Sequence, residues 1–270
     1  MQYLYGDWET LDIRNNNNLK SIWPNQVTPN FFPNLTKIVI YRCESQYVFP
    51  IYVAKVLRQL QVLEIGLCTI ENIVEESDST SEMMVVYLKV RKCHDMMTIV
   101  PSSVQFHSLD ELHVSRCHGL VNIIMPSTIA NLPNLRILMI SECDELEEVY
   151  GSNNESDEPL GEIAFMKLEE LTLKYLPWLK SFCQGSYKFK FPSLQKVHLK
   201  DCHMMETFCH GNLTTTSHIE VRCLYGWSNE ESEDHWDGDL NTTIRTIFTK
   251  EVHINKLQVP SSISYSYFCG

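Results

Sequence analysis

Residues 109–124, LDELHVSRCHGLVNII, are followed by a second copy of the same pattern at residues 135–150, LRILMISECDELEEVY. In both copies, apolar residues stand eight, five and three positions before a cysteine, and three and six positions after it. The upstream half of this spacing recurs before Asn16, Cys43, Cys68, Cys93, Leu176 and Cys202, and a weaker copy ends at Leu224. Eight clear units and one doubtful unit of about 26 residues therefore predict a chain built from repeats.

The unit LxxLxLxx(C/N)xL is the leucine-rich repeat, and its spacing predicts the direction of each side chain. The residues at −5 and −3, counted from the cysteine, alternate in a short strand and point inward, whereas the residue between them points outward. One unit cannot bury its apolar side alone, so neighbouring units stack into a solenoid. We expect an α/β repeat solenoid: a leucine-rich-repeat horseshoe with a parallel concave β-sheet and irregular loops or short helices on the convex side.

The cysteine or asparagine of each unit is expected to turn inward where the strand ends. Six of these slots hold cysteine and one holds Asn16. A small polar group there can bond to loop backbone that would otherwise be buried without a partner. We expect these thiols to be free, because ten cysteines in 270 residues are too few for a disulfide scaffold.

The repeat phase divides the chain into two parts. Residues 1–224 are predicted to form about nine repeats without an N-terminal cap, and residues 225–270 a C-terminal cap or tail. Within the tail we expect a short helix near 240–250 and a strand over 252–259. If nothing covers the first repeat, four of its apolar side chains would face water, namely Leu11, Ile13, Leu19 and Ile22.

Composition and charge exclude several classes of function. The chain carries 22 Lys and Arg against 34 Asp and Glu, a net charge of −12, so we expect no nucleic-acid partner. No apolar run reaches the roughly 18 residues of a membrane span. No basic segment followed by an apolar segment opens the chain, so no secretory signal is visible and a cytoplasmic location is expected.

Charge is distributed unevenly between the expected faces. The outward positions −6, −4, −2 and −1 hold eleven of the basic residues and seven of the acidic ones. Acidic residues gather instead in three loops, around 75–82, 144–162 and 230–239. A basic concave face would attract an acidic protein partner, or it reflects only the tolerance of exposed strand positions for lysine and arginine. The residues predicted to bind protein are Lys37, Tyr41, Arg42, Tyr87, Lys89, Arg91, Lys92, His113, Arg116, Lys174, Lys196, His198 and Lys200.

We identify no catalytic, cofactor-binding or metal-binding residues, and we do not expect an enzyme. Four Cys-His pairs occur, at Cys93, Cys117, Cys202 and Cys209. Zinc needs four converging ligands, and a nucleophilic cysteine needs an accessible thiolate, whereas slot cysteines are expected to be buried. The five tryptophans are interpreted as core or cap residues: Trp8, Trp23, Trp178, Trp227 and Trp236.

Three segments resemble one known family. They run from Phe31-Phe32-Pro33-Asn34-Leu35 to Cys43, from Leu132-Pro133-Asn134-Leu135 through Cys143 to Val149, and from Phe191-Pro192-Ser193-Leu194 to Cys202. They resemble the C-terminal leucine-rich repeats of plant intracellular disease-resistance receptors of the coiled-coil nucleotide-binding class. The tail from Trp236 to Ile244 is similar to a segment that often closes these receptors, and the resemblance covers roughly residues 8–250.

The resemblance implies a non-catalytic recognition module of an immune receptor. Its partner would be a pathogen effector, a guarded host protein or the receptor's own nucleotide-binding domain, whose switch it would regulate. The family's phosphate-binding motif G-x-x-x-x-G-K-[S/T] and its coiled coil do not occur here. Two alternatives remain open: an adaptor that recognises substrates through its repeats, and an inactive truncated receptor fragment.

Overall fold

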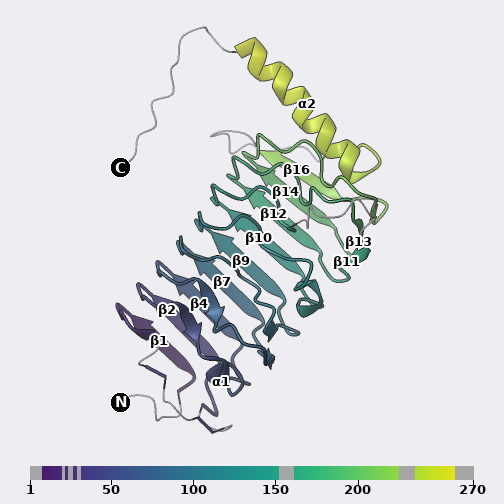
Figure 1. Cartoon of the computed structure of the whole chain (residues 1–270). Helices are drawn as coiled ribbons and strands as arrows, with labels where there is room; N and C mark the ends of the chain where they lie inside the picture. The colour runs from purple at the N-terminus through teal and green to yellow at the C-terminus, as the bar shows by residue number, and fades with distance from the viewer. Residues whose placement is uncertain are drawn as a thin grey trace.

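Nine parallel strands form one continuous sheet along one side of the chain (Figure 1). The computed structural model describes residues 8–19, 22, 23, 27, 28, 32–151, 161–224 and 235–258, without the side chains of residues 224 and 250–258. The strands, in spatial order, are β1 (Thr10–Arg14), β2 (Lys37–Tyr41), β4 (Val62–Gly66), β7 (Tyr87–Arg91), β9 (Glu111–Ser115), β10 (Ile137–Ser141), β12 (Glu170–Lys174), β14 (Lys196–Lys200) and β16 (Glu220–Leu224). This is the parallel leucine-rich-repeat solenoid that the spacing predicts.

Each strand buries its second and fourth residues, which are the positions −5 and −3 of the repeat. Neighbouring strands pair in register, so equivalent positions form straight rows across the sheet; Leu88, for example, pairs with Leu63 and Leu112. The ninth unit departs from the predicted frame. Val221 and Cys223 of β16 pair with Val197 and Leu199, so this repeat lies two residues further along than a copy ending at Leu224. Both frames bury the same alternate residues, because the side chains of a strand repeat with a period of two.

The slot cysteines use their thiols to bond the turn that follows each strand. Cys43, Cys68 and Cys117 each donate to the carbonyl oxygen two residues earlier, over 3.5, 3.2 and 3.4 Å. These thiols are buried and free. Each of these carbonyls also accepts a backbone amide, as that of Gly66 does from Arg42, so the thiol adds a second hydrogen bond there. The backbone group that depends on the slot is an amide: that of Cys43 donates to the sulfur of Cys68 over 3.4 Å.

The residue just before each slot has a left-handed backbone, which the repeat pattern did not reveal. Its φ lies between 51° and 54° at eight positions: Asn15, Arg42, Leu67, Lys92, Arg116, Glu142, Tyr175 and Asp201. The amide of Arg42, for instance, still donates to the carbonyl oxygen of Gly66 over 3.0 Å, so the ladder continues through the turn. The reversal moves these side chains off the concave sheet and onto its rim.

Asparagine and aspartate tolerate that conformation more readily than the other six residues, for which a Cβ in the left-handed region costs about 1–2 kcal/mol. Replacing the exposed Arg42 by asparagine should therefore raise the free energy of unfolding by up to about 1 kcal/mol. The reciprocal change, Asn15→Arg, should lower it by a similar amount. Urea unfolding of both variants checks this, and equal stabilities of the two variants and the wild type would contradict it.

Short elements and loops cover the opposite, convex side. Three small parallel sheets lie there: β3 (Tyr47–Phe49) with β5 (Asn72–Val74), β6 (Ser81–Glu82) with β8 (Val104–Gln105), and β11 (Glu162–Ala164) with β13 (Lys188–Phe191) and β15 (Leu213–Thr215). The short helices are α1 (Ile51–Ala54) and the 3-10 turn Ile129–Asn131. Between the two sides runs one apolar core, which near β13 contains stacked and edge-on phenylalanine rings.

The first described repeat does not expose the side chains expected to face water. Leu11 and Ile13 are 9% and 7% exposed, Leu19 is fully buried, and Ile22 is partly buried against the core. The expectation was wrong because the alternating strand turns Leu11 and Ile13 into the core, where the second repeat covers them. Leu11, Ile13 and Leu19 therefore form no exposed apolar end among the described residues.

Helix α2 (Leu240–Gln258) packs its first two turns against the last repeats (Figure 1). Asp239 caps it by accepting a hydrogen bond from the amide of Thr242 over 2.9 Å. The Asn241 side-chain oxygen accepts hydrogen bonds from the amide of Cys209 and the hydroxyl of Thr207, both over 2.9 Å. The strand expected over 252–259 is wrong: residues 252–258 belong to α2, since no glycine or proline interrupts them.

Candidate functional site

The register of the strands assembles the predicted binding residues into rows on the concave face. Lys89 lies between Glu64 and His113, and Arg91 between Gly66 and Ser115. Lys37, Tyr87 and Lys196 stand at the beginnings of their strands, and Tyr41, Lys174 and Lys200 at the ends. Arg42, Lys92 and Arg116 lie on the rim because of their left-handed turns. The prediction thus names one continuous face with its rim.

Neighbouring strands neutralise part of this positive charge. Lys37 Nζ lies 2.6 Å from Glu64 Oε1, and Arg116 Nε lies 2.7 Å from Glu142 Oε2. Lys200 stands 5.2 Å above the ring of Tyr175, where its ammonium meets the negative face of the ring. These pairs are partly exposed and contribute little stability. Their effect is to remove two of the predicted cations, Lys37 and Arg116, from the charge that a partner would meet.

Seven predicted cations form no ion pair with any described residue: Arg42, Lys89, Arg91, Lys92, Lys174, Lys196 and Lys200. Arg42 and Lys200 instead stand over tyrosine rings. Lys89 and Arg91 alternate on the outward face of β7, and Lys92 follows directly on the rim. Three consecutive outward positions of one strand and its turn thus carry uncompensated charge. We call Lys89, Arg91 and Lys92 the basic cluster.

The two predicted histidines contribute recognition groups rather than charge. Burial lowers the pKa of His113, and Lys89 lowers it further, against the opposing effect of Glu111. Burial likewise lowers the pKa of His198. Both rings are therefore neutral at pH 7. The ring of Tyr87 meets that of His113 edge-on at 4.9 Å between centroids, which makes a half-buried polar floor beside the basic cluster.

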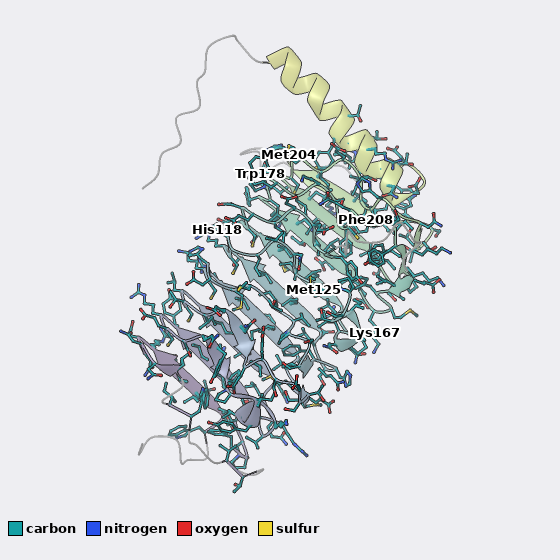
Figure 2. All side chains as sticks on the ribbon, viewed as in Figure 1. His118, Met125, Lys167, Trp178, Met204 and Phe208 are labelled. Carbon is teal, nitrogen blue, oxygen red and sulfur yellow. The ribbon has the colours of Figure 1, made fainter. Side chains whose placement is uncertain are left out.

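An apolar patch on the rim was missed. Trp178 is 57% exposed, Met204 44% and Tyr175 43%, and Figure 2 shows Trp178 and Met204 together at one edge of the solenoid. The interpretation of Trp178 as a core or cap residue is wrong, because the second residue after this slot points out of the turn. Trp178 and Met204 share that position in neighbouring repeats. The phase favours an outside position, since the same position holds Asp95 and Glu145 elsewhere, but it does not decide it, because Ile70 at that position is buried.

The other tryptophans vary in burial. Trp23 is 2% exposed, and Trp8 and Trp236 pack partly buried against the core. Trp227 lies outside the described residues.

The Cys-His pairs do not assemble a reactive site. The rings of His94 and His118 stack at 4.7 Å on the surface, whereas the preceding thiols are buried. Burial raises the pKa of the Cys117 thiol to about 11 and that of Cys143 to about 12, which disfavours a thiolate. The described residues contain no group of three histidine, cysteine or acidic side chains placed to hold a metal ion.

A family described as plant disease resistance protein RPS2-like leucine-rich repeats matches residues 7–91 and 85–210. This match spans most of the chain and every repeat from β1 to β14. The chain belongs to this family. The resemblance noted in the sequence is therefore confirmed: the chain is a leucine-rich-repeat region of the plant disease-resistance type.

Three Arabidopsis thaliana proteins are similar to it. The probable disease resistance protein At1g61310 is 31% identical over 169 residues, and the probable disease resistance protein At4g27220 is 29% identical over 112 residues. The disease resistance protein RPS5 is 23% identical over 145 residues. The aligned segments cover 58%, 40% and 54% of this chain, but only 18%, 12% and 16% of the respective relatives. No solved structure matches the chain.

The family assignment indicates which face of the solenoid is available for binding. Leucine-rich repeats are extended binding scaffolds whose concave sheet offers one side chain in two for contact. No helix among the described residues has the length and apolarity to cross a membrane.

Proposed function

We propose that this chain is the non-catalytic protein-recognition module of a cytoplasmic plant immune receptor. Residues 1–224 would form its repeat domain and residues 225–270 the C-terminal cap. The module would bind a pathogen effector, a guarded host protein or the receptor's nucleotide-binding domain, and through that contact regulate the nucleotide switch. The observation that carries the proposal is the basic cluster: its three adjacent cations form no ion pair with a described residue, whereas Lys37 and Arg116 on nearby strands do.

The rim patch supports the same face. Trp178 follows β12, which is three strands from β7, so about 14 Å of sheet separates the basic cluster from the patch. One protein interface of ordinary size covers that span. Tryptophan, tyrosine and arginine are also the residues that dominate binding energy at interfaces. A partner with an acidic surface and one apolar side chain that packs on Trp178 would fit this face.

We expect that reversing the basic cluster abolishes capture of its partner. The variant Lys89→Glu/Arg91→Glu/Lys92→Glu and the variant Trp178→Ala should each recover at least about tenfold less of one protein from plant extract than the wild type. Higher salt should weaken wild-type capture, because the cluster is exposed. Quantitative mass spectrometry of the captured proteins, with circular dichroism as a check of folding, measures this.

The matched control is Lys55→Glu/Arg58→Glu/Lys167→Glu, which changes the net charge equally at exposed residues outside the concave strands. In Figure 2, Lys167 lies on the side away from His118 and Trp178. It should capture the partner like the wild type. Equal recovery of the partner by all variants would place the binding site elsewhere. If the control variant also lost the partner, the loss would be due to the change in net charge and not to the basic cluster.

A further inference from the structure

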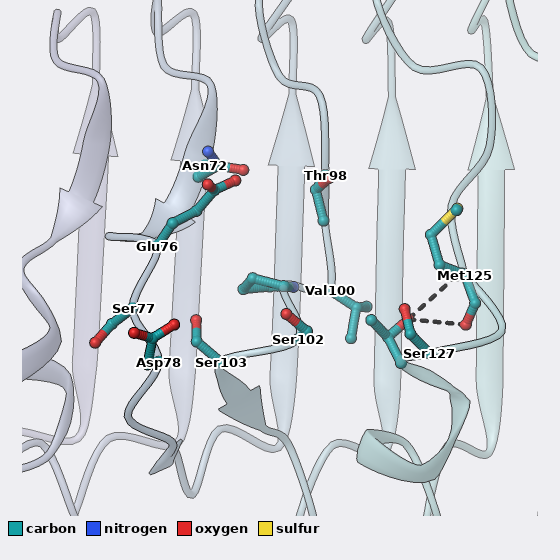
Figure 3. A pocket seen from close by; sticks show the side chains of 12 residues that line it. Asn72, Glu76, Ser77, Asp78, Thr98, Val100, Ser102, Ser103, Met125 and Ser127 are labelled. Atoms are coloured by element: carbon teal, nitrogen blue, oxygen red, sulfur yellow. Dashed lines mark hydrogen bonds between the residues drawn. The ribbon is translucent and has the colours of Figure 1, made fainter.

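A groove of about 560 Å³ lies on the convex side, across the core from the nine-stranded sheet (Figure 3). The loop that carries the first acidic cluster, between β5 and β6, forms one wall. The segment before β8 and the turn before residue 129 form the other. Its lining includes the carboxylates of Glu76 and Asp78 and no lysine, arginine or histidine.

Most polar side chains of the groove have no hydrogen-bond partner among the described residues. Ser77 bonds to Ser79 at 2.9 Å, and Thr128 bonds to the backbone of Met125 at 3.1 Å. The side chains without such a bond are Asn72, Glu76, Asp78, Thr98, Ser102, Ser103 and Ser127. These groups offer more hydrogen-bond acceptors than donors, because an ionised carboxylate only accepts.

Ser103 marks the floor of the groove. It is 5% exposed, and its Oγ is buried without a hydrogen-bond partner. Figure 3 shows its hydroxyl directed into the groove on the same side as the carboxylate of Asp78. A buried hydroxyl that has no partner within the chain is costly, so a donor that reaches it through the groove would gain by pairing with it.

We propose that this groove is a second binding site, which takes an arginine side chain from a basic segment of a partner protein. A guanidinium has five donors, no acceptor and a permanent charge, and its planar fork matches a carboxylate with two parallel hydrogen bonds. Asp78 would accept that fork at the mouth, Glu76 would supply the second negative charge, and Ser103 would accept at the floor. This site takes a basic ligand, whereas the concave face takes an acidic one, so the two proposals stand independently.

The probe is a random 12-residue peptide library displayed on phage and selected on the full chain. We expect a class of arginine-containing peptides to be enriched. Synthetic copies should bind Asp78→Asn and Glu76→Gln at least about tenfold more weakly than the wild type. Replacing the peptide's arginine by lysine should weaken binding less than replacing it by glutamine. Ser103→Ala should weaken peptide binding about threefold or more. If the Ser103 hydroxyl did not contact the peptide, its removal would leave the affinity unchanged.

The control is Glu145→Gln, which removes the same charge at an exposed residue outside the groove and should leave affinity unchanged. Peptides without arginine, or arginine peptides that bind Asp78→Asn as well as the wild type, would overturn the proposal. The proposal would also be overturned if only acidic peptides were enriched and these failed to bind the Lys89→Glu/Arg91→Glu/Lys92→Glu variant, because such peptides bind the concave face and not the groove. A melting temperature raised by calcium chloride alone, and lost in Asp78→Asn, would assign the groove to a cation instead.

Discussion

Replacing Phe182 by alanine should lower the free energy of unfolding by about 3–5 kcal/mol. The ring is fully buried, and it stacks on Phe208 at 5.1 Å between centroids and meets Phe165 and Phe191 edge-on at 5.7 and 5.5 Å. Removal leaves a cavity that two neighbouring repeats line together, and the rigid strands on both sides prevent its collapse.

Urea unfolding followed by circular dichroism measures this loss. Because each repeat contacts only its neighbours, we expect the repeats around β13 to unfold first, so that the single transition of the wild type broadens or divides. Trp178→Ala removes an aromatic side chain larger than phenylalanine from the exposed rim of the same repeat. It should change the free energy of unfolding by less than about 0.5 kcal/mol. Similar losses in the two variants would show that the phenylalanine cluster does not hold the last repeats together.

Replacing Gly211 by alanine should cost about 3 kcal/mol or more, an unusually large effect for one added methyl group. A Cβ at this position would lie 1.8 Å from the carbonyl oxygen of Tyr187 and 2.8 Å from its amide nitrogen. The obstacle is backbone of the preceding turn, which cannot rotate away as a side chain could. The two turns must separate, which would break the 2.8 Å hydrogen bond from the amide of Phe189 to the carbonyl oxygen of Asn212.

Gly161→Ala is the matched control, because a Cβ there would meet nothing within 4 Å. It should leave the melting temperature nearly unchanged, whereas Gly211→Ala should lower it by many degrees or prevent expression of folded protein. Gly119→Ala should behave like Gly211→Ala, since its Cβ would lie 2.2 Å from the carbonyl oxygen of His94. A melting temperature of Gly211→Ala equal to that of Gly161→Ala would contradict the close approach of the turns.

The repeat pattern was enough to predict which side chains lie inside. Leu112 and Val114 are buried where the alternation places them, and the Cys117 side chain turns inward at the end of its strand as expected. The ninth repeat shows the weakness of the same reasoning: Ile219 and Val221 fit the alternation in more than one frame, and only pairing with β14 decides between them. Trp178 shows another weakness, because apolar character suggested the core whereas repeat phase favours an outside position.

Local spacing by itself determined the solenoid, its parallel sheet and the outward positions of the basic residues. The alternation of a strand and the length of a turn depend only on residues that are close together in the sequence, so the sequence alone is enough to predict them. The tertiary structure alone decided that Lys37 and Arg116 are neutralised while the basic cluster is not, and that Gly211 touches Tyr187. Those outcomes depend on atoms brought together from one repeat to the next, about 25 residues away, and no spacing rule specifies which side chains meet there.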